Sequence, residues 1–278
     1  MFRRTTLLYT FGALATVTIF AATFTACKSL TRDVVINLPS VAKQLVVESY
    51  LEPGAPYLLL LTETQDYFGP VQNPIIEGAL VTIRHNGNTD TLRPQAINYG
   101  GQKAVVYLNF KAVPDDYQSE FELYVRTPDG RTCSARTHIL PPVVFDSLNI
   151  YHSGKDNKAA LVAKWKDNPA TEDYYRFVLY RNRLDTFPER TSRISDRLLN
   201  GQEIFLVTGY NYYIGKDTLY AQLYHIDKAY NDYLASVSAA ANANGNPFAQ
   251  PAAVQSNIIG GIGIFTGFPK TQQRVIVQ

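Results

Sequence analysis

"SEFELYVRTPDGRTCSARTHI" (residues 119–139) contains two runs in which apolar and polar side chains alternate, joined by Pro-Asp-Gly at 128–130. Alternation with a period of two is typical of a strand that buries one face. Proline presets its own φ and glycine accepts a positive φ, so this tripeptide favours a tight turn. The stretch therefore predicts a β-hairpin.

Similar patterns fill the chain on both sides of this hairpin. "GALVTIRHNGNTDTLRP" (78–94) predicts a second hairpin, because Asn86-Gly87 supplies the positive φ angles of a two-residue turn. Short strands at this spacing predict β-sandwich architecture. Further strand-like runs, rich in Val, Ile, Leu and Tyr, cover residues 44–51, 56–64, 103–110, 145–151, 159–169, 173–182, 202–210, 217–226 and 273–278.

We predict a mainly β protein with two β-sandwich domains of immunoglobulin or fibronectin type. Pro141-Pro142 breaks the strand pattern, which places the N-terminal domain at 33–141 and the C-terminal domain at 142–278. The second domain contains one predicted helix at about 228–243, where Tyr and Leu recur at helical spacing and alanines favour the helical state. Trp165 is the predicted core anchor of this domain.

The N-terminus has the layout of a secretory signal. Arg3 and Arg4 precede an uncharged run, and "FTAC" (24–27) resembles the lipobox of bacterial lipoproteins. We predict a signal peptide at 1–26, a lipidated Cys27 carrying palmitate-type acyl chains, and a tether at 27–32. An uncleaved membrane anchor and plain secretion are the alternatives, since the run is long enough to span a bilayer at about 20 residues.

Charge and cysteine content narrow the partners. Removing residues 1–26 takes away two arginines and leaves 24 basic and 24 acidic residues. A neutral chain lacks the electrostatic footprint of a nucleic-acid binder, so we predict no nucleic-acid partner. Membrane attachment is then expected through the lipid on Cys27 alone. Cys133 is the only other cysteine. With Cys27 acylated it has no disulfide partner, and we predict a buried, small apolar residue.

Seven stretches spread over nearly the whole mature chain share a pattern with a known family: "VVESYLEPG" (46–54), "DYF" (66–68), "GALVTI" (78–83), "DYYRFVLY" (173–180), "SDRLLNGQEI" (195–204), "IDKAYNDYL" (226–234) and "NGNPFAQPAAVQSNIIGGIGIF" (244–265). Together, and in this order, they resemble the domain of unknown function 4249 family, lipoproteins of Bacteroidota. The resemblance implies an outer-membrane lipoprotein often encoded beside TonB-dependent receptors, with no established activity and no catalytic residue to transfer. It leaves open whether the protein faces the cell surface or the periplasm.

No motif of the sequence indicates catalysis. "GGIGIFTG" (260–267) lacks the third glycine and the following helix of a dinucleotide loop, so we interpret it as glycines that allow close backbone approach. The four histidines show no metal-ligand spacing. "KWKDNPATEDYY" (164–175) groups Asp167, Asn168, Glu172 and Asp173, but its spacing matches no EF-hand and suits a turn. We predict no catalytic residue, no cofactor and no metal.

Tyrosine is abundant, with 19 in the chain. Clusters at 174–175, 210–213 and 230–233 suit either a binding surface or packing on strands. The favoured function is a non-enzymatic accessory or ligand-binding and partner-binding component of a TonB-dependent uptake system. The alternatives are an envelope structural or adhesive lipoprotein, which binds polysaccharide or surface proteins, and a surface hydrolase.

Overall fold

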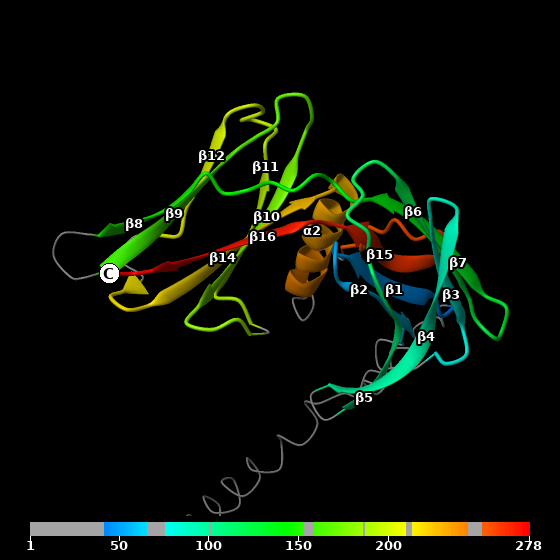
Figure 1. Cartoon of the computed structure of the whole chain (residues 1–278). Coiled ribbons are helices and arrows are strands. Elements are labelled where there is room, and N and C mark those ends of the chain that lie inside the picture. Colours follow the sequence, from blue (N-terminus) through cyan, green and yellow to red (C-terminus); the bar gives the residue numbers. More distant parts are fainter. Residues whose placement is uncertain are drawn as a thin grey trace, which may run out of the picture. The chain divides into compact units, whose positions relative to one another are not determined.

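The computed structural model describes residues 42–65, 76–99, 102–152, 158–185, 187–209, 213–243 and 252–278. These residues are mainly β, with one helix, α2 (Lys228–Ala243), near the C-terminus (Figure 1). The prediction of a mainly β chain with a helix at 228–243 is confirmed.

The first part of the chain builds an eight-stranded sheet in the order β15-β1-β2-β5-β4-β3-β6-β7. Its long strand β4 pairs with β3 through residues 88–92 and with β5 through residues 93–99, so one strand belongs to two groups. The strands are β1 (Leu45–Leu51), β2 (Pro56–Glu63), β3 (Leu80–His85), β4 (Asn88–Tyr99), β5 (Gln102–Ala112), β6 (Glu120–Arg126), β7 (Thr132–His138) and β15 (Gly261–Gly267).

Both predicted hairpins are confirmed. Asn86 and Gly87 connect β3 to β4 with φ angles of 48° and 77°, and Gly130 turns β6 into β7 with a φ of 88°. Alternate residues of these strands, such as Val81 and Phe121, are fully buried in one hydrophobic core. Cys133 lies in the same core as a free thiol, as predicted, and burial raises its pKa to about 11.

The second part of the chain builds two four-stranded sheets. Side chains from both sheets join in a second core, in which Trp165 is fully buried and packs edge-on against Phe145 and Tyr175. Trp165 is thus a core anchor, as predicted. One sheet has β11 (Arg190–Ser195), β10 (Tyr174–Arg181), β14 (Thr218–Ile226) and β16 (Lys270–Ile276), and the other has β8 (Ser147–His152), β9 (Lys158–Lys166), β12 (Glu203–Val207) and β13 (Tyr213–Ile214).

Strand β15 returns the chain to the first sheet. After β14 the chain forms α2, and β15 then pairs in parallel with β1, from Leu45–Gly261 to Leu51–Gly267. No strand is predicted from the sequence at 261–267, and the parallel pairing with β1 corrects that point. The division into domains at 33–141 and 142–278 stays a prediction. Isolated bridges also join Ile259 and Gly267 to the β7 region, so the two ends of the eight-stranded sheet meet.

Glycine is required at this pairing because the backbones approach closely. Gly263 has a φ of 125°, and a Cβ added there would lie 1.9 Å from the Val47 carbonyl oxygen. At Gly261 the added Cβ would lie 2.7 Å from the carbonyl oxygen of Leu45. The prediction that the glycine-rich stretch serves close backbone approach is confirmed.

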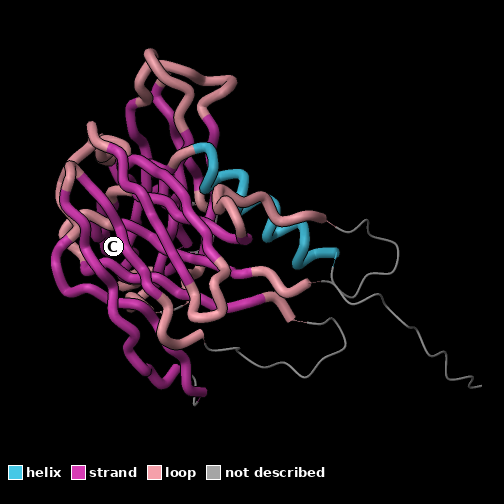
Figure 2. Tube along the Cα trace, turned by 90° about the vertical axis from the view of Figure 1, so that its right-hand side faces the viewer, coloured by secondary structure: helices cyan, strands magenta, loops and turns pink. Residues whose placement is uncertain are grey.

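Asp227 fixes α2 beside this returning strand. Its Oδ1 accepts a bond of 2.7 Å from the Tyr230 amide, which caps the helix N-terminus. Its Oδ2 accepts bonds of 3.3 Å from the hydroxyls of Thr137 in β7 and Thr266 in β15. A third hydrophobic cluster then joins α2 to β10, β14 and β15, and Figure 2 shows the helix lying along the flank of the strands.

We predict that Gly263→Ala lowers the free energy of unfolding by about 2 kcal/mol or more, because both the positive φ and the Val47 carbonyl oppose a side chain. Urea denaturation followed by Trp165 fluorescence measures this loss. Gly87→Ala is the matched control, since Gly87 also has a positive φ but open space around its Cα. Gly87→Ala should lower the free energy of unfolding by only about 1 kcal/mol, through backbone strain alone. Equal losses at the two glycines would contradict the close approach of β15 to β1.

Candidate functional site

Three aspartates meet where β9, β10 and β11 end or begin. Asp167 follows β9, Asp173 precedes β10 and Asp196 follows β11. One carboxylate oxygen from each lies within 4.8 Å of the others, and all three side chains are buried. The sequence groups Asp167 and Asp173 in one acidic turn, and the fold adds Asp196 from a different turn. The predicted neighbours Asn168 and Glu172 are exposed.

Hydrogen bonds from the chain already occupy five of the six carboxylate oxygens of this cluster. Asp167 accepts bonds from the Tyr175 hydroxyl at 2.5 Å and from the Gly201 amide at 2.7 Å. Asp196 accepts one from the Asp173 amide through Oδ2 at 2.8 Å. Its Oδ1 is buried and has no partner among the described residues. The cluster thus ties three turns together and leaves one acceptor unsatisfied.

His225 of β14 contacts this cluster. Its Nε2 lies 3.1 Å from Oδ1 of Asp173, and its Nδ1 lies 2.7 Å from the carbonyl oxygen of Pro141. Both partners are hydrogen-bond acceptors, and which ring nitrogen donates depends on the tautomer. Three carboxylates beside one histidine leave an excess of negative charge in the site. Burial, together with the charges of Asp167 and Asp173, raises the pKa of Asp196.

The chemistry of the cluster admits two ways to remove the excess charge. Three carboxylates are a donor set for a hard divalent cation such as Ca²⁺, which takes 6–8 oxygen ligands. A proton held by Asp196 neutralises one carboxylate without any ligand. Since only one oxygen lacks a hydrogen bond, the proton fits the observed contacts with fewer changes, and the absence of a metal stays our prediction.

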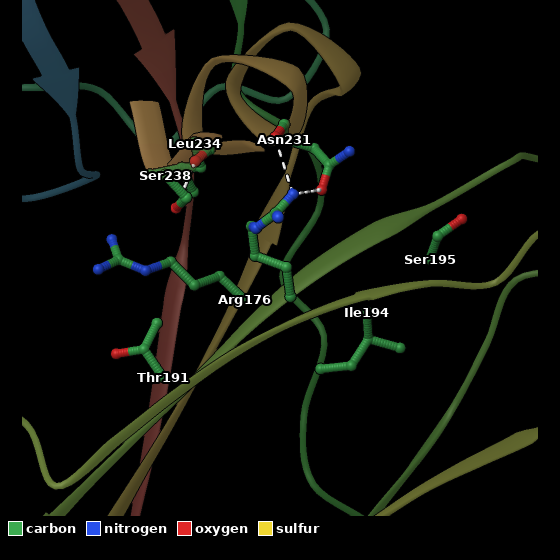
Figure 3. Close-up of a pocket in the computed structure, with 8 residues that line it drawn as sticks. Arg176, Thr191, Ile194, Ser195, Asn231, Leu234 and Ser238 are labelled. Carbon is green, nitrogen blue, oxygen red and sulfur yellow. Dashed lines mark hydrogen bonds between the residues drawn. The ribbon is translucent and has the colours of Figure 1, made fainter. Parts of the chain in front are cut away.

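A cavity of about 600 Å³ lies beneath α2 (Figure 3). It borders the face of β10 and β11 that points away from the second hydrophobic core. Strand β10 contributes Arg176 to the lining of the cavity, and the edge strand β11 contributes Thr191, Arg193 and Ser195. Helix α2 contributes Asn231, Leu234 and Ser238. Figure 3 shows Arg176 between Ser238 of the helix and Thr191 of β11.

Arg176 and Arg193 are direct cross-strand partners in this cavity. Like charges placed opposite each other across an antiparallel pair destabilise the pair. Neither arginine has a carboxylate within ion-pair distance in the described part of the chain. Arg176 Nη1 donates to the Tyr230 hydroxyl at 2.9 Å, and Arg193 Nη1 donates to the backbone and side-chain oxygens of Asn231 at 3.2 and 3.4 Å. The cavity is therefore electropositive, and hydrogen bonds to Tyr230 and Asn231 hold its two guanidinium groups in position.

Comparison with known sequences and structures places the chain in a family. The sequence model of a family described as "Domain of unknown function (DUF4249)" matches residues 31–274. The chain belongs to the DUF4249 family. No curated protein matches this DUF4249 chain. A solved chain titled "Cytokine receptor complex - Crystal form 2" is similar at 10% identity, over 66% of this chain and 92% of that one, with a TM-score of 0.27.

The remaining predicted sites of the DUF4249 chain have different outcomes. Cys27, the signal peptide at 1–26 and the tether at 27–32 lie outside the described residues, so lipidation stays a prediction. Among the four histidines, His225 joins the aspartates, while His85 contacts Asp116 at 3.0 Å. No helix of the described residues is both long and apolar enough to cross a bilayer.

The tyrosine clusters pack in the interior wherever the structure describes them. Tyr175 and Tyr213 are fully buried, and Tyr174, Tyr230 and Tyr233 are nearly so. Tyr210 and Tyr212 lie outside the described residues. For the described members of these clusters, the structure thus shows packing in the interior.

Sequence reasoning missed Arg193 because it missed β11. The stretch "RTSRIS" (190–195) has one apolar residue and reads as loop. Its only signal is alternation, in which Thr191, Arg193 and Ser195 share one face and Ile194 packs on the core.

We predict that Asp196→Asn raises the free energy of unfolding near pH 7.5 by about 1 kcal/mol, because it removes the cost of ionising or protonating a buried carboxyl and keeps the acceptor for the Asp173 amide. The folded-state pKa of Asp196 lies above the unfolded value. The free energy of unfolding of the wild type therefore falls as pH rises from the unfolded-state pKa to the folded-state pKa of Asp196. Below both pKa values, near pH 3, Asp196→Asn should be no more stable than the wild type. Chemical denaturation at the two pH values measures it.

Asp129→Asn is the control of opposite sign. A hydrogen bond from Thr127 lowers the pKa of the exposed Asp129, so its charge stabilises the fold at neutral pH and the substitution should cost stability there. If Asp196→Asn instead destabilised the protein near neutral pH, and Ca²⁺ stabilised only the wild type, a bound cation would replace the proton in this account.

Proposed function

We propose that this protein is a non-enzymatic outer-membrane lipoprotein, anchored through lipid on Cys27, that acts as an accessory or ligand-binding and partner-binding component of a TonB-dependent nutrient uptake system. It needs no cofactor in this role. Either face of the outer membrane is compatible with it. The signal-like segment before Cys27 supports the anchor, and family membership is consistent with the role.

The observation that carries the binding role is the cavity beneath α2. It presents two arginines without carboxylate partners, together with hydroxyl and apolar groups. Among its described lining residues there is no carboxylate, histidine or cysteine that would pair with a hydroxyl for nucleophilic or acid–base chemistry. Such a cavity suits the retention of a ligand rather than its conversion.

The proposed architecture is two β-sandwich domains. The first hydrophobic core receives side chains from every strand of the eight-stranded sheet, and β4 passes from one group of strands to the other. The second core receives side chains from both four-stranded sheets. Two layers that share one core are the defining feature of a sandwich. In this proposal β15 belongs to the first sandwich and β16 to the second.

The lipid gives the binding module its position. Each buried methylene contributes about 0.8 kcal/mol to membrane binding, so several acyl chains on Cys27 hold the protein firmly. Confinement to the membrane plane raises the effective concentration of the module near a membrane receptor without any new contact. The tether at 27–32 then separates the folded part from the bilayer.

We predict that the wild-type protein, tagged at its C-terminus and solubilised from outer membranes in mild detergent, co-purifies with a TonB-dependent receptor. Mass spectrometry identifies the receptor and also tests Cys27 for acyl chains. Cys27→Ser is the matched control, because it keeps the side-chain size and removes the acylation site; it should leave the membrane fraction and lose the receptor.

Recovery of acylated protein without any such receptor, across several growth substrates, would contradict the uptake role and favour the envelope structural or adhesive alternative. A bare Cys27 thiol in the native protein would contradict the anchor itself.

A further inference from the structure

We propose that Arg176 and Arg193 form a binding site for a tetrahedral oxyanion, the phosphate or sulfate group of a ligand, in the cavity beneath α2. This inference rests on the proposed binding role of that cavity. The oxyanion site depends on neither lipid attachment nor the receptor, so it can be tested separately from the proposed uptake role.

The two guanidinium groups leave the same edge free. Arg176 uses Nη1 for the Tyr230 hydroxyl, and Arg193 uses Nη1 for Asn231. No described residue pairs with Nε or Nη2 of either arginine. Nε and Nη2 form the side-on edge of a guanidinium, which binds two oxygens of a carboxylate or phosphate in parallel. Each arginine therefore has one unused bidentate edge, and both arginines line the cavity.

Arg176 has a donor that requires a partner. Its Nε is buried and has no hydrogen-bond partner among the described residues. An unsatisfied buried donor costs about 1–3 kcal/mol, more for a charged group, and such groups in native proteins point to an absent water or ion. An oxyanion at the side-on edge supplies the missing acceptor and also screens Arg176 from Arg193, its partner across the strands.

The surroundings hold Arg176 in place before a ligand arrives. Its guanidinium lies over the Tyr224 ring, 5.8 Å from the centroid. Tyr230, which accepts its Nη1 bond, stacks on Phe268 and contacts Tyr50, and so belongs to the core cluster below α2. A charged group fixed by such contacts loses little entropy on binding, which favours affinity.

A tetrahedral dianion fits this arrangement better than a carboxylate. A carboxylate has two oxygens and one charge, enough for one bidentate edge, whereas a phosphate or sulfate has oxygens for both edges and a charge that matches two arginines. The Thr191 and Ser195 hydroxyls flank Arg193 on the same strand face and lie along the cavity. Leu234 gives the cavity an apolar side for the rest of the ligand.

Isothermal titration calorimetry on the purified full-length protein in detergent tests the site, with inorganic phosphate as the first probe and sulfate and acetate as comparisons. Phosphate and sulfate should bind at one site and compete with each other. Acetate should bind at least about 10-fold more weakly, since it satisfies only one arginine.

Arg193→Gln should weaken phosphate binding about 10-fold or more, because it removes one charged, bidentate edge. Arg190→Gln is the matched control. Arg190 is an exposed arginine of the same strand, lies outside the cavity lining, and among the described residues bonds only to Ser192. It should leave the affinity unchanged. Arg176→Lys keeps the charge under α2 but loses the side-on edge, and it should also weaken binding.

Three results would overturn the site: no phosphate or sulfate binding, equal binding of acetate, or equal weakening by Arg190→Gln, which would indicate general charge attraction. Phosphate binding without capture of a receptor would contradict only the proposed uptake role. Capture of a receptor without phosphate binding would contradict only the oxyanion site.

Discussion

The parallel pairing of β15 with β1 is the contact on which the rest of the structure depends. It brings a segment near the C-terminus beside the first strand of the fold, and it does so only because Gly261 and Gly263 have no side chains to meet the carbonyl oxygens of β1. Asp227 reinforces the pairing through one carboxylate, which caps α2 and accepts hydrogen bonds from the hydroxyls of Thr137 in β7 and Thr266 in β15. Backbone sterics and one shared acceptor thus link both halves of the chain.

The position of the candidate oxyanion site follows from this pairing. Helix α2 lies between β14 and β15 in the chain, and its aromatic face packs against both the returning strand and β10. The helix therefore stands over the outer face of β10 and β11, where it holds Arg176 through Tyr230 and Arg193 through Asn231. The aspartate cluster lies where strands of both four-stranded sheets begin or end, and its hydrogen bonds fix the turns there.

Much of the fold could be predicted from the sequence because period-two alternation and turn chemistry are local signals. The hairpins at Asn86-Gly87 and Gly130, the buried Trp165 and the helix at 228–243 all rest on neighbouring residues. Strand β15 could not be predicted in this way, because its glycines are required by the nearby carbonyl oxygens of Val47 and Leu45, which are distant in sequence. The same reason hid the site: Arg193 becomes meaningful only opposite Arg176, and Asp196 only beside Asp167 and Asp173.

The most direct test of the account is amide hydrogen exchange of the intact protein, resolved to the segments 45–51 and 261–267. If β15 completes the first sheet, the amides of 261–267 that bond to β1 should be protected to a similar degree as those of 45–51, and both segments should lose protection together in rising denaturant. Fast exchange at 261–267 with 45–51 still protected would show that the glycine-rich strand does not pair with β1. The placement of α2, and of the arginines beneath it, would then fail as well.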